Sequence, residues 1–383
     1  MYNEVCAFIH SLYPEKEFVP LHEPRFIGRE KEYLCKAVDS TFVSSVGEYV
    51  NRFEEMVCDY TGAGYAVATV NGTAALHTAL MVGGVRNGDE VLTQPLTFVA
   101  TANAVSYCRA RPVWPVFIDV DRDTMGMSAA ALKTFLDNNT EQTTSDCRNK
   151  ESGRRIAACL PMHTFGHPCR IEEITAICQE RNINLIEDAA ESLGSSRHGR
   201  QTGTFGRLGI YSFNGNKTIT CGGGGVIVTD DEKLAARAKH LTTTAKMPHP
   251  YLYEHDAIGF NYRLPNINAA LACAQLENLP RFIADKRQLA GEYRNFFKET
   301  AGISFVSEPE SCRSNYWLNA VIMPDSTARD NLIKACAASN IMARPAWNLL
   351  PTMPIYAHCQ TDEMANAVWL SERIVNLPSS VRL

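Results

Sequence analysis

The segment YSFNGNKTITCGGGG (211–225) places one lysine, Lys217, among small and polar residues. Lysines that only carry surface charge often alternate with glutamates along a helix, and this lysine does not. The residue order also differs from the Walker phosphate loop, G-x-x-x-x-G-K-[ST]. A lysine in a glycine-rich turn after a strand is suited to forming a Schiff base, which needs an available unprotonated amine. For this motif alone, a reactive lysine and a surface lysine are equally good interpretations.

A carboxylate follows another apolar run. INLIED (183–188) ends in Glu187 and Asp188, and two alanines come next. Burying a carboxylate at the end of an apolar strand is costly unless the carboxylate has a partner. That partner is a helix N-terminus or a structural ion pair in one interpretation. In the other, it is a bound cation such as a protonated pyridine nitrogen.

A small turn follows a third run. YAVATV (65–70) leads into Asn71, Gly72 and Thr73. Such a turn at the start of a helix offers free backbone N–H groups and a hydroxyl, which suit a phosphate. A plain helix cap has the same residues. Ligands of open parallel sheets lie beyond the carboxyl ends of strands, so the lysine, the aspartate and this turn together favour one functional site.

Two further side chains follow strand ends. Phe98 comes after the run DEVLTQP (89–95), and His163 closes the run IAACLPMHT (156–164). Core packing is the ordinary role of such a phenylalanine, and stacking on a planar ring is the alternative. The ordinary interpretation of His163 is a buried histidine with satisfied hydrogen bonds.

The elements that must position these residues alternate between short apolar strands and helices. This alternation predicts an α/β fold with a mostly parallel sheet covered on both faces. The runs 208–213 and 225–230 are closely connected, so we expect an antiparallel or locally mixed pair. The polar segment 138–155 is expected to be an exposed loop. We expect strands at 65–70, 89–95, 112–120, 156–164 and 183–190, and helices at 28–61, 71–84, 97–110, 129–139 and 171–182.

The last third of the chain predicts a second, smaller unit. A long helix is expected from near Asn266, with a kink at Pro280. A strand at 316–324 and a helix at 328–339 follow it. The expected domains are a large one at 1–249, which includes an N-terminal helical segment, and a small one at 250–383, entered through the long helix.

Charge and composition argue against several classes of protein. The formal net charge is -5, so the chain lacks the positive field that nucleic acids and anionic membranes require. Its 13 cysteines form no C-x-x-C pair and no zinc spacing, so we expect reduced thiols and no metal site. No signal peptide or membrane span is recognisable, which makes the cytoplasm the expected location.

In their order and spacing, these motifs resemble the DegT/DnrJ/StrS family of sugar aminotransferases. The family consists of pyridoxal 5′-phosphate enzymes with the aspartate-aminotransferase fold, fold type I. The resemblance therefore implies a mostly parallel, seven-stranded-type sheet in the large domain. It extends from about Pro20 to LPSS (377–380), and the blocks that carry it are NGTAAL, PLTFVATANA, IEDAAES, GTFG, YSFNGNKTIT and GFNYRLPNINAALACAQLE.

The resemblance implies roles around the cofactor ring. Lys217 is similar to the Schiff-base lysine, which also moves the proton between the substrate carbon and the cofactor. Asp188 resembles the partner of the pyridine nitrogen, and Phe98 resembles the ring that stacks on the cofactor. Glu191 lies where relatives carry a residue near the ring hydroxyl, and His163 matches a position near the cofactor.

The resemblance also implies a phosphate cradle made by Gly72, Thr73 and Ser212. Asn261 resembles a residue that reaches the phosphate from the neighbouring subunit. The implied assembly is a homodimer with two shared active sites.

The implied reaction moves an amino group from L-glutamate to a nucleotide-linked keto-deoxy sugar, with pyridoxamine 5′-phosphate formed between the two halves. The segments 42–50 and 344–356 are similar to a subgroup that aminates C4 of UDP-linked 4-keto-6-deoxy-N-acetylhexosamines. This implies a role in bacterial surface glycans such as lipopolysaccharide O-antigen. Gly223 replaces a common glutamate and Pro351 an expected histidine, which leaves the sugar preference open. Candidate substrate-binding residues are His22, Glu23, Arg344 and Trp347.

Two alternatives stay open. One is the same chemistry at C3, on another keto sugar or on a cyclitol. The other is a non-catalytic relative with a regulatory or scaffold role. A nucleotide-binding oxidoreductase is disfavoured because no strand is followed by G-x-G-x-x-G.

Overall fold

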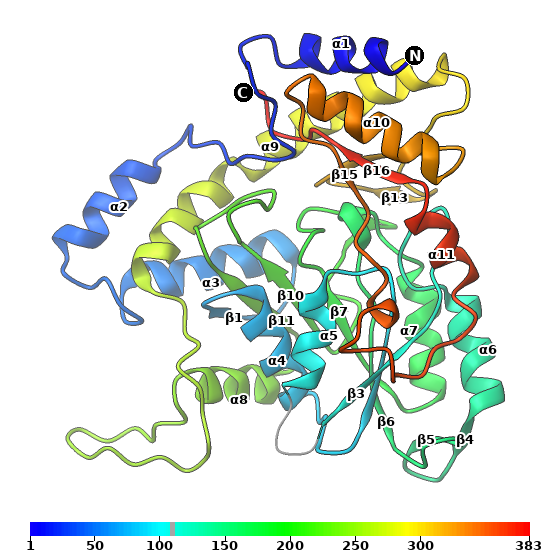
Figure 1. Cartoon of the computed structure of the whole chain (residues 1–383). Helices are drawn as coiled ribbons and strands as arrows, with labels where there is room; N and C mark the ends of the chain where they lie inside the picture. The colour runs from blue at the N-terminus through cyan, green and yellow to red at the C-terminus, as the bar shows by residue number, and fades with distance from the viewer. Residues whose placement is uncertain (108–111) are drawn as a thin grey trace.

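The computed structural model describes residues 1–107 and 112–383 (Figure 1). At its centre is a 7-stranded sheet in the order β1-β11-β10-β7-β6-β2-β3. Strand β11 is antiparallel to both of its neighbours, and the other pairs are parallel. The mostly parallel α/β fold and the locally mixed pair are therefore confirmed. The strands are β1 (Tyr65–Thr69), β2 (Glu90–Thr93), β3 (Trp114–Phe117), β6 (Ile156–Leu160), β7 (Asn184–Asp188), β10 (Leu208–Ser212) and β11 (Gly225–Thr229).

Helices cover both faces of this sheet because its strands are apolar on both sides. Every residue of β6 and β11 is buried. One apolar cluster joins the sheet to α3 and α9, and another joins it to α4 and α8. The helices of this region are α2 (Glu30–Asp39), α3 (Glu48–Thr61), α4 (Gly72–Val82), α5 (Val99–Ser106), α6 (Ala129–Asn139), α7 (Ile171–Glu180), α8 (Glu232–Thr242) and α9 (Asn266–Lys298). Residues 108–110 of the helix expected at 97–110 lie outside the described residues.

Side-chain caps fix where several of these helices begin. The N–H of Ala74 donates to Asn71 Oδ1 at 2.8 Å, so α4 starts directly after β1. Asp231 caps α8 in the same way. Each cap satisfies N–H groups that have no partner within the helix. The predicted turn at 71–73 is thus the first turn of a capped helix.

The long helix α9 joins the two parts of the chain. It spans 33 residues and continues through Pro280. Its first half packs against α2 and α3, and Leu289, Tyr293 and Phe297 in its second half enter a separate core. That core lies under a 4-stranded sheet in the order β12-β14-β16-β15. The remaining elements here are β12 (Ser304–Phe305), β14 (Asn319–Ile322), α10 (Ser326–Ala338), β15 (Arg344–Pro345), α11 (Ala365–Ser371) and β16 (Ile374–Leu377).

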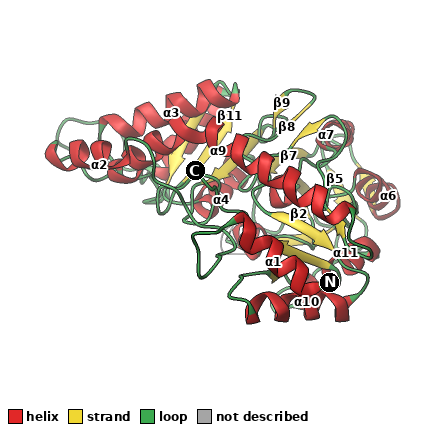
Figure 2. Cartoon of the chain, turned by 90° about the horizontal axis from the view of Figure 1, so that it is seen from above, coloured by secondary structure: helices red, strands yellow, loops and turns green. Residues whose placement is uncertain are grey.

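The first helix, α1 (Tyr2–Leu12), packs with these C-terminal elements. Its apolar face (Val5, Cys6 and Ile9) shares the core of α9 and α10, and Figures 1 and 2 both place α1 beside α10. The expected grouping of residues 1–249 put this helix with the large domain. An apolar helix face packs wherever a complementary face is free, and here α10 supplies it. The domain boundary between residues 249 and 250 stays a prediction.

The segment 138–155 is largely exposed, as expected, but the expectation of a plain loop is wrong. Residues Thr140–Gln142 (β4) and Cys147–Asn149 (β5) pair as an antiparallel hairpin. Asn149 is 1% exposed, and its amide donates to Glu90 Oε2 at 2.7 Å. A strand of three residues is too short to show periodicity, and its polar partner lies far away in the sequence.

Within the described residues, no helix has both the length and the hydropathy needed to cross a bilayer. The same part of the chain holds no group of three or more His, Cys, Asp or Glu side chains that could bind a metal ion.

Candidate active site

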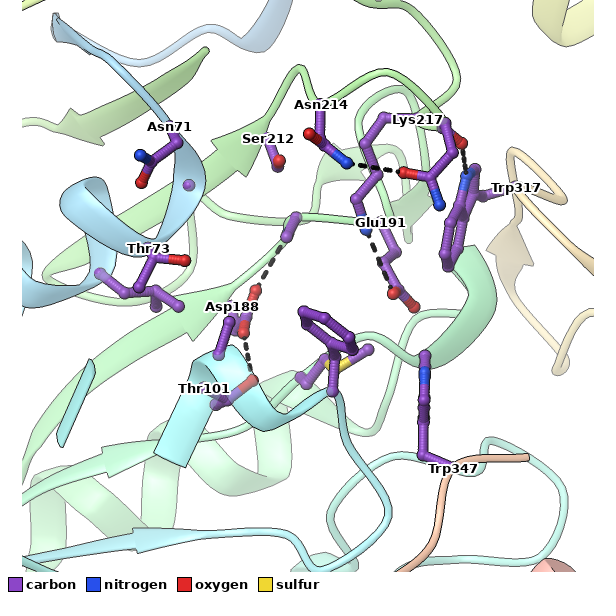
Figure 3. Close-up of a pocket in the computed structure, with 17 residues that line it drawn as sticks. Asn71, Thr73, Thr101, Asp188, Glu191, Ser212, Asn214, Lys217, Trp317 and Trp347 are labelled. Atoms are coloured by element: carbon purple, nitrogen blue, oxygen red, sulfur yellow. Dashed lines mark hydrogen bonds and ion pairs between the residues drawn. The ribbon is translucent and has the colours of Figure 1, made fainter. Parts of the chain in front are cut away.

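A cavity of about 310 Å³ opens at the carboxyl ends of β1, β7 and β10 (Figure 3). This is the edge at which an open α/β sheet is expected to bind its ligand. The structure brings many of the expected site residues into its lining. They are Gly72, Thr73, Phe98, Asp188, Glu191, Ser212, Lys217 and Trp347.

Lys217 is held in a tight turn after β10. Its backbone N–H donates to Asn214 O at 3.0 Å, and its Nζ lies 3.2 Å from Glu191 Oε1. The same Nζ lies 4.0 Å from the centroid of the Trp317 ring, within the range of a cation–π contact. The Trp317 indole N–H in turn donates to Asn216 O at 2.7 Å. The lysine is therefore positioned from both sides and only 14% of its side chain is exposed.

Glu191 is a buried carboxyl group that faces this lysine. Burial raises its pKa to about 7, although Lys217 and the N–H of Phe165, which donates to Oε2 at 3.0 Å, partly oppose the shift. The side chain thus changes charge near neutral pH, within contact distance of the lysine.

Asp188 ends β7 at the floor of the pocket. The hydroxyl of Thr101 donates to Oδ2 at 2.8 Å, and the N–H of Ala190 donates to Oδ1 at 3.1 Å. Burial nevertheless raises the pKa of Asp188, since these donors and Lys217 only partly compensate for lost solvent. A positive charge at this position would favour the ionised form, and the protonated ring nitrogen of pyridoxal phosphate is such a charge.

The start of α4 and Ser212 form the third side of the pocket. The first N–H groups of a helix have no partner within it, and they favour an anion. A Cβ atom on Gly72 would lie 3.0 Å from Cβ and 3.1 Å from Oγ of Ser212, so a side chain here would fill the space between them. The glycine therefore keeps a small, polar cradle open. The residues present fit a cofactor that has a phosphate, a basic ring nitrogen and an aldehyde.

Two aromatic rings lie at the pocket mouth. Phe98 stands directly before α5 and is 51% exposed. Its ring centroid lies 6.4 Å from that of Trp347, whose ring also lies 5.0 Å from Phe165. The exposed Phe98 ring is free to stack on a planar ligand, which stays a prediction.

Some expected site residues lie elsewhere. His163 is fully buried behind the pocket, where Nε2 lies 3.0 Å from Glu187 Oε2 and Nδ1 accepts the N–H of Cys169. Burial lowers the pKa of His163, but Cys169 and Glu187 oppose this and raise it to about 10. Glu23 pairs with Lys16, and it lines neither this pocket nor the neighbouring cavity that contains His22.

The other expected substrate contacts lie beside the pocket. His22 and Arg344 line that neighbouring cavity, and Trp347 lines both. Asn261 is exposed within the segment that joins α8 to α9, outside the lining of this chain's own pocket. Its role in a partner's site stays a prediction.

Sequence reasoning missed several lining residues. Thr101 lies one helical turn after Phe98, so its place on α5 could have been predicted from the helix start. Trp317 comes from the C-terminal part, 100 residues after Lys217, and no local pattern indicates their contact. Asn214 and Asn216, two of the polar residues around Lys217 in the segment 211–225, also line the pocket.

The buried Glu191 predicts a pH effect. With a pKa of about 7, the carboxyl group is ionised above pH 7 and loses its charge toward lower pH. We expect the rate of the donor half-reaction to fall below pH 7, and this acidic limb to be absent in Glu191→Gln. Glu232→Gln, an exposed position on α8, is the matched control. A pH profile of Glu191→Gln that coincides with the wild type would contradict the assignment.

Comparison with known proteins agrees with this geometry. Residues 25–383 match the model of the DegT/DnrJ/EryC1/StrS aminotransferase family. A GDP-perosamine synthase of Escherichia coli O157:H7 is 36% identical over 363 residues, covering 95% of this chain and 93% of that protein. A family aminotransferase from Brucella abortus has a TM-score of 0.83 at 28% identity, covering 93% of this chain and 91% of its own.

A third similar protein is DesI, whose crystal structure was determined in the presence of its TDP-sugar product. It has a TM-score of 0.82 at 26% identity, and the match covers 95% of this chain and 88% of that one. The match to the family model extends over more than nine-tenths of the chain and includes Lys217, Asp188 and the start of α4. The chain therefore belongs to the DegT/DnrJ/EryC1/StrS family and is a pyridoxal 5′-phosphate-dependent aminotransferase.

Proposed function

We propose that this aminotransferase moves an amino group from L-glutamate to a keto-deoxy sugar carried on a nucleoside diphosphate. The observation that carries the proposal is the convergence of Lys217, Asp188 and the start of α4 on one cavity. When bound, pyridoxal 5′-phosphate supplies an aldehyde and an electron-withdrawing ring that accept an amino group and pass it on.

Each part of the pocket has its own task in this proposal. The Lys217 amine would remove the proton from the substrate carbon and return it to the cofactor carbon that carries the aldehyde group. Glu191, 3.2 Å away, balances the charge of the lysine as it gains and loses that proton. Asp188 holds the ring nitrogen protonated, and the start of α4 with Ser212 holds the phosphate. Phe98 covers one face of the ring.

The acceptor in the proposal is a UDP-linked 4-keto-6-deoxy-N-acetylhexosamine, aminated at C4 for a bacterial surface glycan. The names of the compared proteins support a nucleotide-linked sugar, since one is a GDP-perosamine synthase and another has a TDP-sugar product. The first of these names also makes a GDP-linked keto sugar the acceptor to compare with the UDP-linked sugar.

We place the enzyme in the cytoplasm, as a homodimer in which Asn261 serves the partner's site. Large apolar side chains of the same segment between α8 and α9 support an interface: Tyr251 is 79%, Tyr253 82% and Ile258 79% exposed. Clustered exposed apolar groups commonly mark a protein contact. Light scattering should give the mass of two chains, and a mass of one chain would contradict the assembly.

An absorbance titration of the purified holoenzyme tests the reaction. L-Glutamate should bleach the visible band of the bound cofactor, and the accepting keto sugar should restore it. Adding the UDP-linked and GDP-linked sugars separately identifies the nucleotide. Initial rates should follow ping-pong kinetics. If glutamate bleaches the band and neither sugar restores it, the acceptor class is wrong. If glutamate has no effect, the amino donor is wrong.

A further inference from the structure

A second cavity of about 460 Å³ adjoins the catalytic pocket. The two share Asn216, Trp317 and Trp347 as common walls. Figure 3 shows Trp317 beside Lys217, and Trp347 lies below Trp317 in this view. A ligand that reacts at Lys217 can therefore extend a remote group into the second cavity.

The wall of this cavity carries polar atoms that have no protein partner. Both ring nitrogens of His22 are buried and unpaired with respect to the described residues. The same holds for Oδ1 of Asn376, a side chain on β16 that is only 4% exposed. A buried polar atom without a hydrogen bond costs free energy, so such a group commonly indicates a missing ligand or water.

Arg344 brings a positive charge to the same wall. It lies on β15 directly opposite Asn376 on β16, and opposite residues of an antiparallel pair project to the same face. Its guanidinium forms no ion pair or hydrogen bond with residues 1–107 or 112–383. Among the described lining residues it is the one Arg, Lys, Asp or Glu.

The balance of charge limits the ligand. Burial, with nearby Lys286 and Lys217, lowers the pKa of His22 well below 6.5, so the imidazole is neutral and offers one donor and one acceptor. The cavity then has a single positive charge. This suits one carboxylate, which a guanidinium binds through two parallel hydrogen bonds, better than a diphosphate with its greater charge.

We infer that this cavity binds the distal carboxylate of the dicarboxylic amino acid that supplies the amino group. Arg344 provides the positive charge, and the ring N–H of His22 provides a further hydrogen bond. The α-carbon of the amino acid must lie at Lys217. The distal carboxylate is the group farthest from the α-carbon, so it is the one that reaches past Asn216, Trp317 and Trp347 into the second cavity. The inference rests on the proposed function for its amino-acid donor. It assigns Arg344 and His22 to the donor and leaves the nucleotide to other residues.

The test compares wild-type holoenzyme with Arg344→Gln, using Arg313→Gln on the short strand β13 (Cys312–Arg313) as the matched arginine control. The first measurement is the glutamate concentration that half-bleaches the cofactor band. We expect this glutamate concentration to be about 30-fold higher or more in Arg344→Gln. The bleaching rate at saturating glutamate and the concentration of keto sugar that the enzyme requires should stay nearly unchanged. Arg313→Gln should match the wild type.

The second measurement does not depend on turnover. Glutarate, a five-carbon dicarboxylate without an amine, should bind the wild type in calorimetry and bind Arg344→Gln at least about 30-fold more weakly. The inference is overturned if Arg344→Gln keeps the wild-type affinity for glutarate and glutamate. It is also overturned if Arg344→Gln requires a higher concentration of the nucleotide sugar alone. If the wild type ignores glutamate, the proposed function fails, and glutarate binding still decides the role of the cavity.

Discussion

Replacing Lys217 with alanine should lower turnover by about four orders of magnitude or more, because in the proposed function this one side chain supplies both the cofactor linkage and the proton transfer. The fold should persist, since the lysine lines a cavity from a turn and contributes little apolar packing. Glu191 loses its cationic neighbour in this variant, so its pKa should rise above about 7 and the carboxyl should stay neutral at that pH.

The measurements are single-turnover amination, the absorbance of the bound cofactor and the unfolding temperature. Lys133→Ala is the matched control, because Lys133 forms an exposed ion pair with Asp137 on α6, outside both cavities. The control should keep wild-type activity. Amination by Lys217→Ala at a rate near that of the wild type would show that another group forms the covalent link.

Replacing Asp188 with asparagine should lower turnover by about 10²–10³-fold, the usual effect of losing one preorganised charge at a reacting centre. The asparagine has nearly the same shape but no negative charge for the ring nitrogen. Its NH₂ group cannot accept a hydrogen bond, so either the N–H of Ala190 loses its acceptor or the hydroxyl of Thr101 must turn to accept instead of donate.

The same substitution should have the opposite effect on the stability of the cofactor-free protein. Because the pKa of Asp188 is raised above 3.8 in the folded state, the folded protein binds this proton more tightly than the unfolded chain does. Ionisation of Asp188 at neutral pH therefore costs folding free energy, and Asn removes this cost. We expect cofactor-free Asp188→Asn to melt at or above the wild-type temperature, and to gain less on adding pyridoxal phosphate.

Thr101→Val separates charge from hydrogen bonding at this position. It removes the bond to Oδ2 and keeps the carboxylate, so we expect a loss of roughly tenfold, smaller than that of Asp188→Asn. Equal cofactor-induced gains in melting temperature for wild type and Asp188→Asn would contradict the role of this carboxylate.

Sequence patterns alone predict the mostly parallel sheet and the part of the site that follows its strand ends. Alternating apolar strands and helices define β1, β7 and β10, and parallel strands in one sheet bring their carboxyl ends to one edge. The residues after those ends therefore meet, as Lys217, Asp188 and Gly72 do. Such information is local, since a strand, its turn and the next helix cap lie within about 20 residues.

Contacts that depend on packing between distant segments were decided by the tertiary structure. The position of α9 brings Trp317 to Lys217, and the register of β15 on β16 sets Arg344 opposite Asn376. Burial likewise placed His163 behind the pocket and put α1 against α10. Residues near Lys217, Asp188 and α4 follow from the sequence because strand ends converge. The second cavity does not, because its walls join residues more than 100 positions apart through the docking of two apolar cores.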